Sequence, residues 1–366
     1  MKDSHPVRVL LVAPSLDILG GQAVQASRLL DLLRCEPGVQ VEFLPINPRL
    51  PGPLRALQRV KYVRTAATGA AFLFRLLRKA GRCDVLHAFS AANYSFLLSA
   101  APATVVGRMY GKKTIVNYRD GRAAQHLAGW RTARLLRWAD VIVTPSEYLV
   151  RVFGEFGYQA RPIFNVVDLT RFRYRERNPV RPVFLHNRGH EELYNIPCTL
   201  KAFGLVQQRY PEASLTLAHD GPLRQRLERT VLEWGLRNVS FVGHVPPGRI
   251  PALYDAADIY LTSPNVDNMP GSLLECYASG LPVVATRAGG IPYIARDGEN
   301  ALLVPVNDHE AMARAALRLL EEHGLAQRIS AAARRECERY SWTSVRGRWL
   351  SLYEDLVRSG RAEDTL

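Results

Sequence analysis

Two carboxylates flank a Pro-Gly turn in the second half of the chain. In the stretch SPNVDNMPGSLLE, Asp267 stands eight positions before Glu275. Ser272, with Glu275 three residues later, has the form of a capping box, which predicts a helix that starts at Ser272. Alternatively, the backbone amides at this helix start hold a diphosphate, while the two carboxylates accept hydrogen bonds from sugar hydroxyls. The local sequence leaves both interpretations open.

A glycine pair follows the first apolar run of the chain. Gly20 and Gly21 come after VRVLLVAP at 7–14 and open a helical pattern. Backbone amides at a helix N-terminus, together with the helix dipole, favour a bound phosphate. A tight turn that binds no ligand is the alternative interpretation of this pair.

Short apolar runs alternate with amphipathic stretches along the whole chain. The runs predict strands at 7–14, 40–46, 83–89, 112–118, 139–146, 181–187, 213–221, 239–245, 258–264, 281–290 and 301–307. The amphipathic stretches predict helices between them, for example at 26–34, 72–81, 129–139, 200–210 and 222–235. Strands that alternate with helices predict an α/β fold with doubly wound parallel sheets.

The length predicts two such domains. A chain of 366 residues is longer than a single hydrophobic core usually supports. We place one Rossmann-like domain at 1–170 and a second at 171–340, with the charge-rich stretch at 171–182 as the linker. The helical tail at 340–366 carries an apolar stripe, which predicts packing back on the first domain or across both; ordinary core packing explains the stripe equally well. Ligands of open parallel sheets bind beyond the carboxyl ends of the strands, so we expect the site in a crevice between the domains.

The positive charge is concentrated in the first half. Residues 1–170 hold 23 Lys and Arg against 11 Asp and Glu, whereas residues 171–366 hold 25 against 23. The densest segment, 49–82, has nine basic residues and no acidic one, interleaved with apolar residues. This pattern is typical of a surface that docks on an anionic membrane, or else of a solvated arginine-rich face. We recognise no nucleic-acid-binding module and expect no nucleic-acid partner.

The cysteines and the N-terminus indicate the compartment. The five cysteines are widely spaced and form no C-x-x-C pair, so the sequence predicts neither a disulfide framework nor a zinc site. The N-terminal apolar run is too short for a signal peptide or a membrane span. We therefore expect a cytoplasmic protein, peripheral at the inner face of the membrane if the basic segment docks there.

A pattern that runs through much of the chain resembles one family. Residues 263–308 are similar to the signature of retaining nucleotide-sugar glycosyltransferases of the GT-B fold, family 4: an acid-x7-Glu motif, PVVA, a GG-I-P turn and a DG-x-N segment before a buried strand. LAHDGPLRQRLE at 217–228 matches the G-x-G-P turn of the family, and FNVVDLTRF at 164–172 matches its domain junction. The specific matches extend from about 140 to 310.

This resemblance implies roles for individual residues. Glu275 would bind the nucleotide ribose, Asp267 would contact the donor sugar, and Arg188 would grip the diphosphate and stabilise it as it leaves. The remaining donor-binding residues implied are Asn268, Met269, Pro270, Gly271, Ser272, Leu273 and Gly221, with Gly20 and Gly21 from the other domain. The family usually needs no metal or other cofactor.

The sequence also departs from the family pattern. A Lys that commonly follows the Arg is missing, because the region reads Glu192-Leu193-Tyr194-Asn195. The H-x-H of the first domain is His87-Ala88-Phe89, and Tyr118-Arg119-Asp120 stands where the next strand usually ends near a His. We hypothesise that Arg119 replaces the missing cation in catalysis. The acceptor-side candidates are His87, Asp120 and His126; a structural histidine at a strand end is the alternative for the two histidines.

The resemblance therefore implies a function. We expect a retaining glycosyltransferase that moves a sugar from a nucleotide-diphosphate sugar to a lipid-linked, polysaccharide-precursor or other glycan acceptor. The alternative is a catalytically degenerate relative that serves as a partner subunit in polysaccharide biosynthesis. The missing Lys and His residues keep that alternative open.

Overall fold

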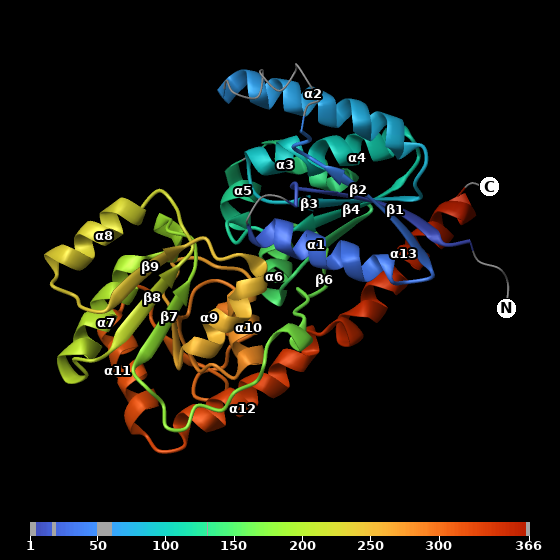
Figure 1. Cartoon of the computed structure of the whole chain (residues 1–366). Helices are drawn as coiled ribbons and strands as arrows, with labels where there is room; N and C mark the ends of the chain where they lie inside the picture. The colour runs from blue at the N-terminus through green and yellow to red at the C-terminus, as the bar shows by residue number, and fades with distance from the viewer. Residues whose placement is uncertain (1–4, 17–19, 50–60, 130, 364–366) are drawn as a thin grey trace. The chain divides into compact units, whose positions relative to one another are not determined.

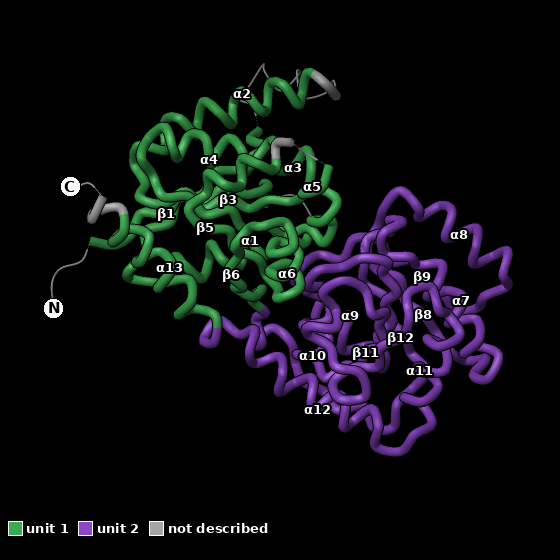
Figure 2. The backbone as a smooth tube through the Cα atoms, turned by 180° about the vertical axis from the view of Figure 1, so that it is seen from behind, with its two compact units in different colours: residues 1–166, 345–366 green, residues 167–344 purple. Residues whose placement is uncertain are grey.

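The computed structural model describes residues 5–16, 20–49, 61–129 and 131–363 (Figure 1). The chain divides into two compact units (Figure 2). Unit 1 comprises residues 1–166 together with 345–366, and unit 2 comprises residues 167–344. The boundary lies at Val166–Val167, and the end of the chain returns to unit 1. No helix in the described ranges is both long enough and apolar enough to cross a membrane.

Unit 1 is built on a parallel sheet with the strand order β2-β1-β3-β4-β5-β6. Its strands are β1 (Val7–Ala13), β2 (Val39–Pro45), β3 (Val85–Ser90), β4 (Lys113–Tyr118), β5 (Val141–Thr144) and β6 (Ala160–Pro162). Its helices are α1 (Gly21–Arg34), α2 (Lys61–Ala80), α3 (Tyr94–Leu98), α4 (Ala100–Met109), α5 (Ala123–Gly129) and α6 (Glu147–Glu155), with a 3-10 helix at Arg131–Trp138. Apolar residues of the strands and of α2, α4 and α6 share one core.

Unit 2 has a second parallel sheet, in the order β12-β11-β10-β7-β8-β9. Its strands are β7 (Val183–Asn187), β8 (Ser214–Ala218), β9 (Val239–Gly243), β10 (Ile259–Thr262), β11 (Val283–Thr286) and β12 (Leu302–Val304). Its helices are α7 (Ile196–Arg209), α8 (Arg224–Glu233), α9 (Ile250–Ala256), α10 (Gly271–Ser279), α11 (His309–Glu321) and α12 (Leu325–Cys337). The strand order reverses between β7 and β10, which makes their carboxyl ends the topological switch point where such sheets bind ligands.

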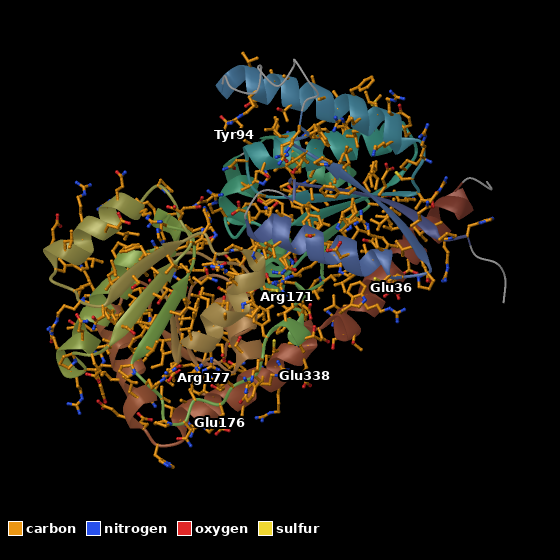
Figure 3. All side chains as sticks on the ribbon, in the orientation of Figure 1. Glu36, Tyr94, Arg171, Glu176, Arg177 and Glu338 are labelled. Atoms are coloured by element: carbon orange, nitrogen blue, oxygen red, sulfur yellow. The ribbon has the colours of Figure 1, made fainter. Side chains whose placement is uncertain are left out.

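The last helix, α13 (Trp342–Glu363), begins in unit 2 and continues in unit 1. In unit 1, the Arg346 guanidinium forms two hydrogen bonds to the Glu36 carboxylate, at 2.7 and 2.6 Å (Glu36 is labelled in Figure 3). Trp349 and Tyr353 are buried and stacked on each other, and the Tyr353 hydroxyl lies 2.8 Å from Nδ1 of His87. These contacts bind the end of the described chain to the core of unit 1.

The predicted strands are all present, and the expectation of doubly wound parallel sheets is confirmed. The short strand β6 was not predicted, because its three residues contain no apolar run. The stretch predicted as a helix at 129–139 forms a 3-10 helix instead of an α-helix. Apolar periodicity detects a helical face, but over so few residues it does not distinguish a 3-10 helix from an α-helix.

The charge-rich stretch at 171–182, predicted as the linker, packs several of its arginines into unit 2. Arg177 is only 2% exposed, and its guanidinium donates to the carbonyl oxygens of Tyr254 and Ser279 near the ends of α9 and α10 (Figure 3). Arg175 and Arg181 both bind the fully buried carboxylate of Asp258, at 2.8 and 2.9 Å. These cations satisfy carbonyl and carboxylate groups inside unit 2, so a run of charges here is part of the packing.

Candidate functional site

A buried ion pair lies at the switch point of unit 2. Arg188 directly follows β7, and Asp267 lies in the loop between β10 and α10. The Nη2 atom of Arg188 is 2.5 Å from Oδ2 of Asp267, and the two side chains are 14% and 11% exposed. The other oxygen of Asp267, Oδ1, accepts a hydrogen bond from the Asn268 amide at 2.8 Å. Both carboxylate oxygens are therefore engaged within unit 2.

The loop that carries Asp267 is pressed against a glycine turn. Gly289 has a φ of +52°, and a Cβ placed on it would lie 2.1 Å from the Asp267 carbonyl oxygen. A Cβ on Gly290 would lie 1.9 Å from the Asn268 carbonyl oxygen. The Gly290 amide donates to the Asp267 carbonyl oxygen at 2.9 Å. Only glycine permits this approach of two backbones, which explains the GG that precedes Ile291 and Pro292.

Arg188 is also clamped by an aromatic ring that sequence reasoning missed. The guanidinium carbon lies 4.2 Å from the centre of the Tyr194 ring, and Nη1 lies 3.4 Å from Oγ of Ser272. Burial opposes the charge of Arg188, but the Asp267 carboxylate outweighs it and raises the pKa of Arg188 above its ordinary value. The family pattern has a Lys in the region of Tyr194. In this chain the face of the Tyr194 ring lies against the Arg188 guanidinium there.

The capping-box interpretation of Ser272 and Glu275 is wrong. Helix α10 begins at Gly271, with Pro270 as its N-cap, so Ser272 is already its second residue. Proline lacks an amide hydrogen and favours helix starts, and it moves the start of this helix ahead of Ser272. Gly280, with a φ of +68°, ends α10 as predicted.

Glu275 instead accepts a hydrogen bond from a buried tyrosine. The Tyr254 hydroxyl donates to Oε2 of Glu275 at 3.0 Å and accepts from Nδ2 of Asn187 at 3.1 Å. Tyr254 is fully buried, and burial raises its pKa well above the ordinary value, so the hydroxyl keeps its proton. Tyr254 therefore fixes one oxygen of Glu275; sequence reasoning missed it because it lies 21 residues away in another helix.

The structure brings most of the donor-binding candidates together. Those in unit 2 around the start of α10 are Arg188, Asp267, Asn268, Met269, Pro270, Gly271, Ser272, Leu273 and Glu275. Gly221 follows β8, and a Cβ on it would lie 2.5 Å from the His190 carbonyl oxygen, so packing requires a glycine there. In unit 1, Gly20 caps α1 after β1, and a Cβ on Gly20 or Gly21 would meet no described atom within 4 Å. Packing within the described residues therefore does not require glycine at these two positions.

His87 is the centre of a buried hydrogen-bond chain in unit 1. Arg119 donates to Oδ1 of Asn117 at 3.2 Å, so the Asn117 amide group faces Nε2 of His87, 3.1 Å away. Nε2 must accept, so the proton is on Nδ1, which lies 2.8 Å from the Tyr353 hydroxyl. Burial first, and then the Arg119 charge, lowers the pKa of His87 to about 3. This geometry favours the structural alternative for His87.

The other candidates of unit 1 also have partners. The Asp120 carboxylate pairs with Arg122 at 2.8 Å, and Nδ1 of His126 lies 2.9 Å from the Tyr118 hydroxyl. Arg119 contacts Asn165 as well as Asn117, and burial lowers its pKa to about 9. The acceptor-side roles of Asp120 and His126, and the catalytic role of Arg119, remain predictions.

No group of three or more His, Cys, Asp and Glu side chains that could hold a metal ion occurs among the residues the structure describes. The expectation that donor binding needs no metal remains a prediction. Charge compensation at this site would then come from arginine and from backbone amides.

Two family models match the chain, one on each side of the boundary between the units. Residues 2–166 match the model described as glycosyl transferase 4-like domain. Residues 174–336 match the model described as glycosyl transferases group 1, and this range includes Arg188, Asp267 and Glu275.

Two curated relatives of the chain are also sugar transferases. The chain is 30% identical over 231 residues to a sulfoquinovosyl transferase of Arabidopsis thaliana, an alignment that covers 59% of this chain and 45% of the relative. It is 29% identical over 304 residues to the GDP-mannose-dependent alpha-(1-6)-phosphatidylinositol monomannoside mannosyltransferase of Mycolicibacterium smegmatis. This alignment covers 72% of the present chain and 76% of the relative. The alignments span 45%, 39% and 29% of the length of the first three curated relatives.

The structure of Anabaena HepE in complex with UDP and glucose is similar, with a TM-score of 0.73. The identity is 16%, and the match covers 95% of this chain and 99% of that chain. At this identity the likeness shows the fold, which is two Rossmann-like domains.

The substitution Asp267→Asn is expected to lower the free energy of unfolding of unit 2 by about 3–5 kcal/mol, because it leaves the Arg188 charge buried without its carboxylate. Urea unfolding measures this loss. Glu321→Gln is the matched control, since Glu321 pairs with Arg209 at the same 2.5 Å but the two side chains are 38% and 65% exposed. That control should lose less than about 1 kcal/mol; equal losses in the two variants would contradict the role of the buried pair.

The neutral state of His87 predicts a pH dependence of stability. Its pKa is about 3 in the folded chain against an ordinary 6.5, so the unfolded chain binds a proton that the folded chain does not. Stability is therefore lost as the pH falls from about 6.5 toward 3, by up to ~1.4 kcal/mol per pH unit from this residue. His87→Gln should flatten the curve of unfolding free energy against pH by that amount, and parallel curves would exclude this role.

Proposed function

Because the chain belongs to the group 1 glycosyltransferases of the GT-B fold, we propose that it transfers a sugar from a nucleotide-diphosphate sugar to a hydroxyl group with retention of configuration. The proposed acceptor is a lipid-linked, polysaccharide-precursor or other glycan molecule. The observation that carries the proposal is the Arg188–Asp267 pair beside Glu275, at the switch point of the unit 2 sheet.

The donor would bind by an exchange of charge partners at Arg188. A diphosphate gives the guanidinium new oxygen partners, and Asp267 is then released to accept hydrogen bonds from sugar hydroxyls. Glu275, which Tyr254 holds by one hydrogen bond, would accept hydrogen bonds from the ribose hydroxyls. The relative from Mycolicibacterium smegmatis depends on GDP-mannose, and Anabaena HepE was solved with UDP. The proposal therefore leaves both the base and the sugar open.

The chemistry needs little more than these groups. The bond between the anomeric carbon and the phosphate oxygen breaks, its electron pair stays on the leaving diphosphate, and Arg188 stabilises that charge. The acceptor oxygen attacks on the same face of the sugar, and its proton passes to the departing phosphate oxygen. The Asn268 amide holds Oδ1 of Asp267, and sugar hydroxyls would occupy Oδ2 once Arg188 binds the diphosphate, which disfavours Asp267 as a covalent nucleophile. Arg119 remains our candidate for the cation that the missing Lys would supply.

The basic segment at 49–82 is proposed as a peripheral docking surface for an anionic membrane on the cytoplasmic side. Residues 50–60 of this segment lie outside the described residues. In α2, the apolar residues Phe72 and Leu76 pack in the core of unit 1 and do not face a membrane. The exposed residues that remain, Val63, Arg64, Leu73, Phe74 and Arg78, combine apolar and cationic side chains on α2, which lies alongside α4 (Figure 1). Such a combination suits an anionic lipid surface.

The purified protein is expected to release a nucleoside diphosphate from one member of a panel of common nucleotide sugars, with membrane extract as the source of acceptor. Arg188→Lys should lower kcat/KM by roughly 10²–10³-fold, because the diphosphate loses a planar two-point donor. Arg119→Ala should also lower it, and unchanged turnover would remove Arg119 from the mechanism. Arg209→Lys, at an exposed arginine of the same unit, is the control.

Nuclear magnetic resonance of the product should show the same anomeric configuration as the donor. If no donor is turned over, the partner-subunit alternative is favoured.

The protein is also expected to co-sediment with anionic vesicles but not with neutral ones, and to be released by high salt. The double variant Leu73→Ser, Phe74→Ser should reduce binding, because these side chains are 43% and 60% exposed on α2. Leu232→Ser, which removes a 79% exposed leucine of unit 2, is the control. Equal binding to neutral vesicles would contradict the docking surface.

A further inference from the structure

His219 has a backbone conformation that ordinarily selects glycine. It follows β8 directly, at the carboxyl end of the unit 2 sheet, and its φ is +87°. The four other non-glycine residues with positive φ in the described ranges are all asparagines: Asn93, Asn195, Asn238 and Asn307. Asparagine tolerates this conformation better than most residues, and a bulky side chain there is uncommon. In the G-x-G-P turn that LAHDGP matches, His219 stands where the first glycine would be.

A hydrogen bond and a ring contact hold His219 at the carboxyl end of the sheet. Its amide donates to the Gly243 carbonyl oxygen at 2.7 Å, and its ring meets the edge of the His244 ring with 4.8 Å between the centres. Its Nδ1 lies 3.3 Å from the Asp220 carbonyl oxygen, a long contact that is favourable when Nδ1 carries the proton. Nε2 is then the atom that can gain a proton.

Arg188 and His219 directly follow Asn187 and Ala218, which are paired between the neighbouring strands β7 and β8, so both residues leave the sheet at the same level. Burial lowers the pKa of His219, and the charges of His244 and Arg188 lower it further, whereas the Asp220 carbonyl group and the Glu191 carboxylate oppose them. His190, after β7, also interacts electrostatically with His219. Because the pKa of His219 lies below its ordinary value, the ring is neutral near pH 7 in the empty site. An anion beside Arg188 would favour the protonated ring.

We propose that His219 is a diphosphate-binding residue that takes up a proton when the nucleotide sugar binds, and so supplies a second positive charge beside Arg188. This inference rests on the proposed function, because the anion is the diphosphate of the donor. This charge would add to the one that Arg119 is proposed to supply in place of the missing Lys, and it gives a function to a histidine in a conformation that favours glycine. Arg119 keeps its charge between about pH 6 and pH 8, so only a histidine gives donor binding that depends on pH in this range.

Calorimetric titration with UDP-glucose, GDP-mannose and ADP-glucose, at about pH 6 and about pH 8, tests the proposal on the full chain. The diphosphate of a nucleotide sugar does not titrate in this range, so any pH dependence comes from the protein. Wild type should bind its donor roughly tenfold more tightly at the lower pH, since binding takes up a proton. His219→Gly should lose this dependence and bind about tenfold more weakly at the lower pH.

The thermal midpoint separates this role from a structural one. Glycine accepts the φ of residue 219, so His219→Gly should unfold at the same temperature or at a higher one. Asn238→Gly is the matched control, because Asn238 also has positive φ, 56°, but precedes β9 at the opposite end of the sheet. This control should keep the affinity of wild type and its pH dependence.

Three results would overturn the inference. If wild type and His219→Gly show the same affinity ratio between the two pH values, His219 does not bind the diphosphate, and the proposed function is unaffected. If uridine, guanosine or adenosine, which carry no phosphate, show the same pH dependence, the histidine contacts the base or ribose. If wild type binds none of the nucleotide sugars, the proposed function fails, and this inference fails with it.

Discussion

The ion pair between Arg188 and Asp267 is the contact on which the arrangement of the donor site depends. It joins the two loops that leave β7 and β10, where the strand order reverses. Charges that are only 14% and 11% exposed are costly unless each is compensated, so the pair fixes both loops while the site is empty. The Gly289-Gly290 turn and the Tyr194 ring then press against the two partners. A diphosphate that enters can replace the carboxylate, and at no stage is a buried charge left without a partner.

The sequence predicted the framework well because strands buried on both sides are continuous apolar runs. It also singled out Arg188, Asp267 and Glu275 as donor-site candidates, but only through a family pattern that extends along the chain. The pairings around them were not predictable locally, since Tyr254 and Tyr194 reach their partners across other elements. The capping box was wrong because α10 starts at Gly271, directly after Pro270. The charge run at 171–182 did not reveal that Arg177 binds buried carbonyl groups of unit 2.

Unit 1 shows how a departure from a family pattern is accommodated. Phe89 stands where the second histidine of H-x-H would be, and its ring centre lies 5.3 Å from the centre of the His87 ring and 5.1 Å from the Arg119 guanidinium carbon. A second histidine would have brought another polar group into a layer where Asn117 and Tyr353 already satisfy His87. Phenylalanine instead offers a flat face to both neighbours. Unit 2 uses its buried arginine differently, because there the partner is a carboxylate.

The path of α13 has a consequence for biosynthesis. Trp349 and Tyr353 close the layer that contains His87, yet the ribosome adds them only after all of unit 2. The sheet of unit 1 therefore lacks the cover of α13, and the His87 layer stays exposed to water, while unit 2, about half of the chain, is synthesised. During this interval it presents an apolar surface to chaperones and to neighbouring nascent chains. Unit 2, which is continuous in sequence, can fold as soon as it leaves the exit tunnel, so the second sheet to be synthesised can be the first to be complete.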